Sequence, residues 1–251
     1  MPKISVLLSV FNSEEVLERA LSSLVSQSFK DFEILVLDDG STDSSARIID
    51  DFVKKDHRIK AFYFDSNLGL AKRLNFLLGE ASAPLIARAD ADDCYHPERL
   101  QKQYDRICND ESIDVLGTWG FYVDGNGTIL SKVMMPINHE DIVQRIAKSN
   151  PFLHSSILAK KSFFIKNGGY KENLRKKQDY DLWVRGLKKA RYENLPEYLI
   201  YYRFDENKSL LTDLYGFRVR CLNFLTLGDP RCLYYAVAVL GYNFLKKMRF
   251  K

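Results

Sequence analysis

Three carboxylates stand within four residues at Asp90, Asp92 and Asp93, directly after an apolar stretch. Acids this close repel one another strongly unless a cation neutralises them. Hard oxygen ligands at this density suit Mg²⁺ or Mn²⁺, which bind one or two carboxylates together with substrate phosphates. The alternative is a solvated loop that caps a helix expected to begin near His96 and Pro97.

A second acidic group begins with two consecutive acids, Asp38 and Asp39, and ends at Asp43. A carboxylate at this point can accept a hydrogen bond from the imide N–H of a uracil ring. A tight turn with Gly40 at positive φ, followed by a helix N-cap at Thr42 or Asp43, is the structural alternative. The turn alone does not explain two acids in succession.

The third group is Asp179 and Asp181, at the start of an expected helix. Residues two apart do not share a helix face, so we expect different roles for them. A carboxylate at a helix N-terminus is stabilised as the anion, and one that faces a crevice can act as a general base. An ordinary N-cap, with Leu182 and Trp183 in the core, is the alternative.

The elements that must position these acids follow a regular alternation. Up to Asp93, apolar runs alternate with stretches of helical periodicity, which predicts an open, mostly parallel α/β sheet. Such sheets bind ligands at the carboxyl ends of their strands, so the ends of the first, second and fourth strands should share one crevice. We expect strands at 4–10, 32–37, 59–64 and 85–89, and helices beginning at Asn12 or Ser13, at 48–53 and at 70–78.

Beyond Asp93 the alternation weakens. We expect a further layer on the same sheet, with a helix from Pro97, a hairpin turn at 124–127, and a strand at 153–158 that carries His154. The predicted organisation is one domain over 1–205, made of a nucleotide-binding half (1–93) and an acceptor-side half (94–205). A helical extension follows at 206–251.

Composition excludes several classes of protein. A formal charge of +4 on 251 residues is too small to indicate nucleic-acid binding. The four cysteines are scattered without metal-ligand spacing, which favours reduced thiols in a cytoplasmic protein. The first residues lack the pattern of a signal peptide.

The end of the sequence is basic, with no acidic residue after Asp229. An apolar, aromatic stretch at 232–245 is too short to cross a bilayer, which takes about 20 residues. Two interpretations stay open: a basic helix that lies on an anionic membrane surface, and a helix that packs on the domain and ends in a solvated tail.

Taken in order, these motifs resemble glycosyltransferase family 2, whose members have the GT-A fold. The resemblance covers most of the chain, from Ile4 to about Arg203, and its subfamily is that of bacterial capsule, exopolysaccharide and O-antigen assembly. It rests on Ser5–Asn12, Ser26–Phe29, Asp38–Asp43, Asn67–Ala71, Ala89–Asp93 and Gln178–Trp183.

The resemblance implies an α/β GT-A fold and inverting transfer of a hexose from a nucleoside-diphosphate sugar, with UDP favoured. The implied acceptor is a lipid-linked oligosaccharide or a polysaccharide. Ser9 and Phe11 would line the nucleobase pocket, and Asp39 would bind the uracil N3–H. Asp90 and Asp92 would hold the ribose and the metal-bound diphosphate.

The resemblance also implies roles in metal binding, catalysis and phosphate binding, and two of these keep alternatives. Either Asp92 or Asp93 would bind the metal directly, and Asp179 would deprotonate the acceptor. The candidates for phosphate or donor-sugar contacts are three cations: Lys72, Arg73 and Arg88. Lys72 and Arg73 could equally lie on a helix surface.

The sequence departs from the family pattern at two positions. Gln178 stands where the family often has Glu, and Asp205 stands where many relatives carry a His, two residues after Arg203. Asp205 could replace that His as an oxygen ligand. His154 borders the acceptor pocket by resemblance, but a lone His on a strand is more often a hydrogen-bonded structural residue.

The sequence bears on two rival functions. A dinucleotide-dependent oxidoreductase is disfavoured because no glycine-rich phosphate loop follows the first strand. A non-catalytic nucleotide-sugar-binding or assembly module of the same fold remains the alternative, since the two departures at Gln178 and Asp205 affect the acceptor side and the metal side.

Overall fold

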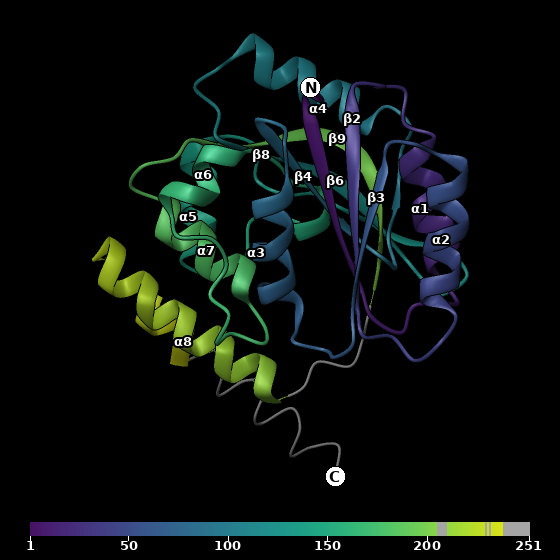
Figure 1. Ribbon diagram of the computed structural model, residues 1–251. Coiled ribbons are helices and arrows are strands. Elements are labelled where there is room, and N and C mark those ends of the chain that lie inside the picture. The colour runs from purple at the N-terminus through teal and green to yellow at the C-terminus, as the bar shows by residue number, and fades with distance from the viewer. Residues whose placement is uncertain (205–209, 229, 231, 238–251) are drawn as a thin grey trace.

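The first third of the protein is a regular alternation of strands and helices (Figure 1). The computed structural model describes residues 1–204, 210–228, 230 and 232–237. Strands β1, β2 and β4 are each joined in parallel to a neighbour, as is β3 to β2. The elements are β1 (Ile4–Val10), α1 (Leu17–Val25), β2 (Phe32–Asp39), α2 (Ser45–Lys55), β3 (Ile59–Phe64), α3 (Leu70–Glu80) and β4 (Leu85–Asp90).

The second part of the chain continues the same sheet. The strand order is β3-β2-β1-β4-β8-β6-β9-β5, with β7 paired to β6. Strand β8 is antiparallel to β4 and to β6, whereas β6 and β9 are parallel. The further elements are β5 (Cys94–Tyr95), α4 (Arg99–Asn109), β6 (Val115–Val123), β7 (Ile129–Val133), α5 (His139–Ile146), η1 (His154–Ser156), β8 (Leu158–Lys160), α6 (Lys161–Lys166), α7 (Gln178–Gly186), β9 (Tyr192–Arg203) and α8 (Leu210–Leu227).

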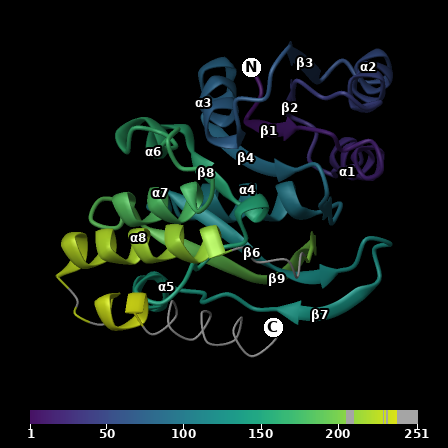
Figure 2. The same cartoon turned by 90° about the horizontal axis from the view of Figure 1, so that it is seen from below.

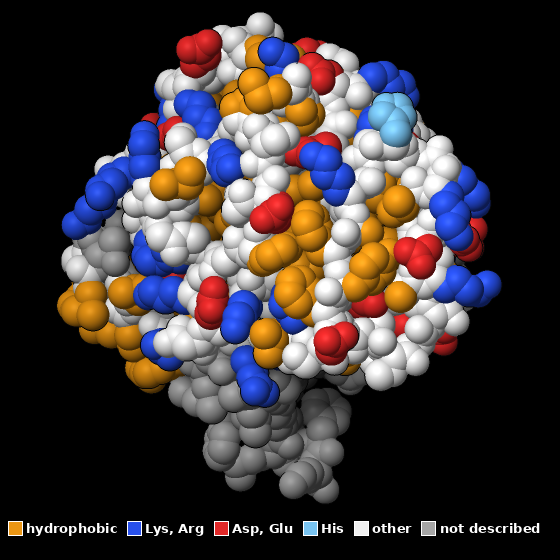
Figure 3. Space-filling view, viewed as in Figure 1, with side chains coloured by type: hydrophobic (Ala, Val, Ile, Leu, Met, Phe, Trp, Pro, Cys, Tyr) orange, Lys and Arg blue, Asp and Glu red, His pale blue; other side chains and the backbone are white. Residues whose placement is uncertain are grey.

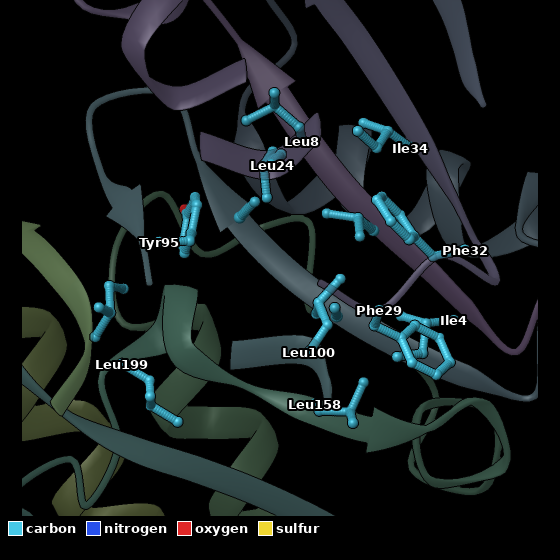
Figure 4. Packing of buried hydrophobic residues seen from close by; sticks show 14 of the residues in the cluster. Ile4, Leu8, Leu24, Phe29, Phe32, Ile34, Tyr95, Leu100, Leu158 and Leu199 are labelled. Atoms are coloured by element: carbon cyan, nitrogen blue, oxygen red, sulfur yellow. The ribbon is translucent and has the colours of Figure 1, made fainter. Parts of the chain in front are cut away.

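Hydrophobic side chains fill both faces of the sheet. Successive residues of a strand point to opposite faces, so Leu8 of β1 packs with Leu24 of α1 while Leu7 packs with Leu74 of α3. Figure 4 shows the first of these two clusters, where Leu8, Leu24 and Ile34 converge between the sheet and the helices. Two buried layers hold the central strands rigid and fix where their carboxyl ends lie.

Part of one face of the sheet stays open at its β3 edge. Figure 3 shows hydrophobic side chains gathered in this region, beside α3. Phe76 of α3 meets Phe62 and Phe64 of β3 edge-on, each pair with ring centroids 5.2 Å apart.

Most of the predicted elements are confirmed, and β3 has the predicted bounds. The helix expected to begin at Asn12 or Ser13 begins later, at Leu17, because residues 14–16 form a turn in which Val16 N donates to Ser13 O. The strand expected at 153–158 is wrong. A 3₁₀ turn occupies 154–156, where Ser156 N and Oγ both bond to Leu153 O, and the strand β8 starts at Leu158.

Helix α8 packs against α7 (Figure 2). Within the described ranges, no helix has both the length and the apolar character needed to cross a bilayer. Asp205 lies outside the described residues, and so do the basic residues of the tail: Arg231, Lys246, Lys247, Arg249 and Lys251. Of the apolar stretch 232–245, only residues 232–237 are described.

Candidate active site

A pocket of about 430 Å³ opens at the carboxyl ends of β1 and β4. Five residues predicted from the sequence meet there: Ser9, Phe11, Asp90, Asp92 and Arg203. The rest of the lining is Asn12, Ser13, Glu14, Glu15, Val16, Asp43 and Ala91. The ring of Phe11 is 45% exposed, which leaves a free aromatic surface at the end of β1.

Hydrogen bonds join the loop after β1 to the loop after β2. Asn12 has a positive φ of 45°, and its Oδ1 accepts a hydrogen bond of 2.9 Å from Thr42 N. Asp43 Oδ2 accepts from Glu14 N, and Glu14 Oε2 accepts from Ser44 N. These reciprocal bonds give the Asp38–Asp43 segment a structural role beside the pocket. Gly40 has the predicted positive φ, of 76°, but the N-cap residue of α2 is Ser44 and not Thr42 or Asp43.

Asp90 is neutralised by a buried cation. Arg88, two residues earlier on β4, is 2% exposed, and its Nη2 donates to Asp90 Oδ1. In the described part of the chain, Nε and Nη1 of Arg88 have no hydrogen-bond partner. Arg88 therefore lies directly beside the pocket as a buried positive charge with unused donors.

Asp92 and Asp93 are adjacent in sequence but differ in environment. Asp92 is exposed and lines the pocket. Asp93 is 2% exposed, and its carboxylate accepts from Ser155 Oγ and, at 2.8 Å, from the backbone N of Arg203. Asp93 thus ties the end of β4 to β9 and to the η1 turn, away from the pocket.

The remaining acids of this loop suit a divalent cation. Loss of surrounding water and then the charge of Asp90 raise the pKa of Asp92, and this repulsion is what a bound cation would relieve. Within the described ranges, Asp92 makes no ion pair. The same part of the chain contains no group of three His, Cys, Asp or Glu side chains placed to hold a metal ion by themselves. Two carboxylates with donor phosphate oxygens are a ligand set that Mg²⁺ or Mn²⁺ accepts, so the residues fit the metal.

Asp39 lies at the end of β2 and is 2% exposed. Its carboxylate accepts from Leu68 N at 3.0 Å and Gly69 N at 2.9 Å, and pairs with Nε of Arg73. Arg73 is itself buried, with Cζ 3.8 Å from the Phe64 ring centroid. The pair fixes the start of α3, and neither residue lines the pocket.

The neighbour of Arg73, Lys72, is exposed on α3 and does not line the pocket.

Asp179 is in the first turn of α7 and is not among the residues that line the pocket. The residue that precedes the helix, Lys177, has a left-handed backbone with φ of 62°, which turns the chain into the helix. Asn150 Nδ2 donates to Asp179 Oδ2 at 2.5 Å. Burial raises the pKa of Asp179 despite this bond and the charge of Lys177. A raised pKa makes a carboxylate a better base once it is deprotonated.

Besides burial, the charges of Asp179 and of the acids at the end of β4 raise the pKa of the same two tyrosines, Tyr170 and Tyr202. Burial is the largest cause that raises the pKa of Tyr202, and negative charges add to the rise: those of Asp90, Asp93, Asp179 and Asp92. The pKa of Tyr170 is also raised by burial, with contributions from Asp179 and Asp90. The charges of both groups of acids therefore add to the rise in pKa of the same two side chains.

Two further predicted residues are buried on α7. Gln178 is 7% exposed and its Oε1 has no partner among the described residues. Asp181 is 2% exposed and pairs with Arg185 and Lys171, which makes it a structural anion rather than a pocket residue.

His154 lies on the η1 turn, and its Nε2 is 2.9 Å from Tyr170 Oη. Burial, and then the charge of Arg88, lowers the pKa of His154 well below its usual range, so the ring is neutral.

Several residues of the site were missed from the sequence: Asn150, Ser155, Tyr170 and Tyr202. Each is a common residue type with no motif around it that reports a partner. In the sequence, the segment with Asn150 and Ser155 stands out only because it contains His154, and Tyr202 only because it precedes Arg203.

The fold is that of the GT-A class of glycosyltransferases. The glycosyl transferase family 2 model matches residues 5–168, and the chain belongs to that family. Two Escherichia coli relatives are the O-antigen biosynthesis glycosyltransferase WbnJ, 30% identical over 82% of this chain and 81% of WbnJ, and a UDP-Gal:α-D-GlcNAc-diphosphoundecaprenol β-1,3-galactosyltransferase, 28% identical over 82% of this chain and 75% of that protein.

Solved structures share the fold. Staphylococcus aureus TarS 1–349 in complex with UDP-GlcNAc superposes with a TM-score of 0.71 at 22% identity, over 89% of this chain and 66% of that one. The chain spans 42% of full-length TarS. A mannosyltransferase from Pyrobaculum calidifontis, in complex with GDP-Man and Mn²⁺, has a TM-score of 0.66 at 15% identity, over 96% of this chain and 74% of that one.

Proposed function

We propose that the protein is an inverting hexosyltransferase that takes a UDP-sugar and extends a lipid-linked or polysaccharide acceptor of bacterial surface polysaccharide synthesis. One observation carries the proposal: the pocket combines an exposed aromatic ring, Phe11, with the carboxylates of Asp90 and Asp92. A separate carboxylate of raised pKa, Asp179, starts α7, and its charge acts on Tyr202 as the charges of Asp90 and Asp92 do.

The donor would lie along the carboxyl ends of β1, β2 and β4. Phe11 would stack on the uracil and Ser9 would contact its edge. Asp39 has its Oδ2 bonded to one backbone donor, Gly69 N, and so keeps an acceptor position for the imide N–H. Arg88 would stabilise Asp90 and offer its unused donors toward the donor sugar or phosphates.

Asp92 would hold the divalent cation, with Asp90 beside it. When bound, that cation stabilises the negative charge of the diphosphate as it leaves. Asp93 is not a metal ligand in this proposal, because it is 2% exposed, does not line the pocket, and has its carboxylate held by Ser155 and Arg203. Arg203, from the other wall of the pocket, adds a positive charge near Asp92.

Asp179 would act as the base. Its carboxylate takes the proton of the acceptor hydroxyl as that oxygen bonds to the anomeric carbon. The bond from the anomeric carbon to the diphosphate oxygen breaks in the same displacement, which inverts the configuration, and UDP leaves. Burial of Asp179 supports this role, because it raises the pKa toward the value a general base needs.

The acceptor's lipid would bring the protein to the inner face of the cell membrane. Apolar side chains support this: Leu225 is 78% exposed on α8, and Tyr234 and Val237 are 68% and 66% exposed. Co-sedimentation with anionic vesicles, using the full chain and one ending at residue 228, tests it. Equal partitioning of the two chains would leave the packed-helix interpretation.

A thermal-shift screen of nucleotide sugars with and without Mn²⁺ tests the donor, followed by assay of UDP release. We expect stabilisation by a UDP-sugar that depends on Mn²⁺, and release of UDP when an acceptor is added. Stabilisation without UDP release under any acceptor would favour the non-catalytic binding module. No stabilisation by any nucleotide sugar would contradict both.

A further inference from the structure

Four aromatic side chains form a continuous surface on one face of β6 and β9: Trp119, Phe121, Tyr198 and Tyr201. The Phe121 ring stacks on Tyr198 and Tyr201 at centroid distances of 4.8 and 5.6 Å, with planes 23° apart in both pairs. Trp119 contacts Tyr198 at 5.4 Å. We call this set the aromatic platform.

The aromatic platform belongs to neither hydrophobic core cluster of the described residues. Tyr122 and Tyr202, on the opposite face of the same strands, do pack against a core, whereas the four platform rings do not. All four are half-buried, so each is supported from the side and retains exposed surface. Such rings are not explained by packing.

The polar groups of the platform are arranged around its edge. Trp119 Nε1 is used by a hydrogen bond of 2.8 Å to Met135 O. The hydroxyl groups of Tyr198 and Tyr201 have no hydrogen bond recorded within the described ranges. Lys132 Nζ lies 5.3 Å from the Tyr198 ring centroid and adds a cation at the rim.

The platform leads from the proposed donor pocket. Sheet register places Lys132 of β7, Phe121 of β6, Tyr201 of β9 and Cys94 of β5 side by side on one face. Figure 2 shows β6, β9 and β7 near one another, and strand pairing places β9 and β7 each beside β6. Cys94 follows the acidic loop directly, and Arg203, two residues beyond Tyr201, lines the pocket. Across three strand spacings the row extends about 14 Å.

We propose that the aromatic platform is a saccharide-binding surface that receives the pyranose rings of the acceptor chain as it leaves the active site. Aromatic rings carry negative charge on their faces, which matches the weakly positive C–H groups on the face of a pyranose. The tyrosine hydroxyls and Lys132 then supply donors for sugar hydroxyls. The assignment rests on the proposed function, because it assumes a glycan acceptor.

Affinity electrophoresis of the full chain tests the platform. Native gels contain dextran, mixed-linkage β-glucan, hyaluronan or xanthan, and migration is compared with gels that lack polysaccharide. We expect at least one polysaccharide to retard the wild-type protein, and the double variant Phe121→Ala, Tyr198→Ala to lose at least threefold in apparent affinity. Tyr198→Phe keeps the ring and should retain most of the retardation.

Tyr63→Ala is the matched control, because Tyr63 is 47% exposed on β3, far along the strand order from β9. It should migrate as the wild type does. Absence of retardation by all four polysaccharides, or equal retardation of the double variant, would overturn the platform. Thermal stabilisation by UDP-sugar and Mn²⁺ is measured on the same variants and on the wild type. If the wild type shows no such stabilisation, the proposed function alone is contradicted, whatever the gels show.

Discussion

The side-chain amide of Asn150 donates a hydrogen bond of 2.5 Å to Oδ2 of Asp179. An N–H donor favours the charged carboxylate, so this bond opposes the larger rise in pKa that burial causes. The two residues are 29 positions apart in the sequence. Their contact fixes the orientation of the proposed base at the start of α7.

Asp179→Asn should abolish transfer while leaving donor binding intact. The amide keeps the shape of the side chain but cannot accept a proton, and loss of a general base costs about 10²–10⁴-fold in rate. Turnover and UDP-sugar affinity, measured by calorimetry, check this. Turnover within a few-fold of the wild type would remove Asp179 from the mechanism.

Asn150→Ala should shift the acid limb of the pH–rate profile to higher pH. Asp179 must be deprotonated to act, and its pKa is already above the ordinary aspartate value because of burial. Removing the Asn150 donor destabilises the anion and raises that pKa further. An acid limb that stays in place, or moves to lower pH, would contradict the assignment.

Asp92→Asn and Asp93→Ala should fail in different ways. Asp92 is exposed and makes no ion pair in the described ranges, so its replacement should change stability by less than about 0.5 kcal/mol and abolish stabilisation by Mn²⁺. Asp93 holds Ser155 and the backbone of Arg203, and losing it should cost about 2–3 kcal/mol. Denaturant unfolding with and without Mn²⁺ separates the two, and the reverse pattern would exchange their roles.

Glu33→Gln should destabilise the protein by about 2 kcal/mol at neutral pH. Burial alone would raise the pKa of Glu33, but hydrogen bonds from Lys60, Ser82 and Ser5 outweigh it and lower the pKa from 4.5 to about 2. A lowered pKa stabilises the fold above pH 4.5, and that stability is lost as the pH falls toward 2.

The difference between wild type and Glu33→Gln in urea unfolding should therefore shrink as the pH falls from 4.5 toward 2. Exposed Glu80→Gln is the control and should change little. A difference that is independent of pH would show that the charge of Glu33 is not what stabilises the protein.

Local patterns were sufficient for the first half of the fold. The strand at 59–64 and the hairpin turn at 124–127 are determined by nearby residues, and the strand-end rule correctly brought Ser9, Asp90 and Asp92 together. The strand predicted around His154 failed because a short apolar run does not distinguish a strand from a 3₁₀ turn.

The roles of the acids could not be separated from the sequence. Asp92 and Asp93 look equivalent there, and what distinguishes them comes from Ser155 and Arg203, which are 62 and 110 residues from Asp93. Asp39 and Arg73 likewise pair across 34 residues. Long-range partners of this kind leave no local signal.

A crystal structure with UDP and Mn²⁺ tests the central claim most directly. The account predicts uracil against the ring of Phe11 and a metal ion about 2.1 Å from a carboxylate oxygen of Asp92, bridging to the diphosphate. Asp93 should keep its contacts with Ser155 and Arg203. Density for UDP outside the pocket, or a metal ion bound by Asp93 and not by Asp92, would contradict it.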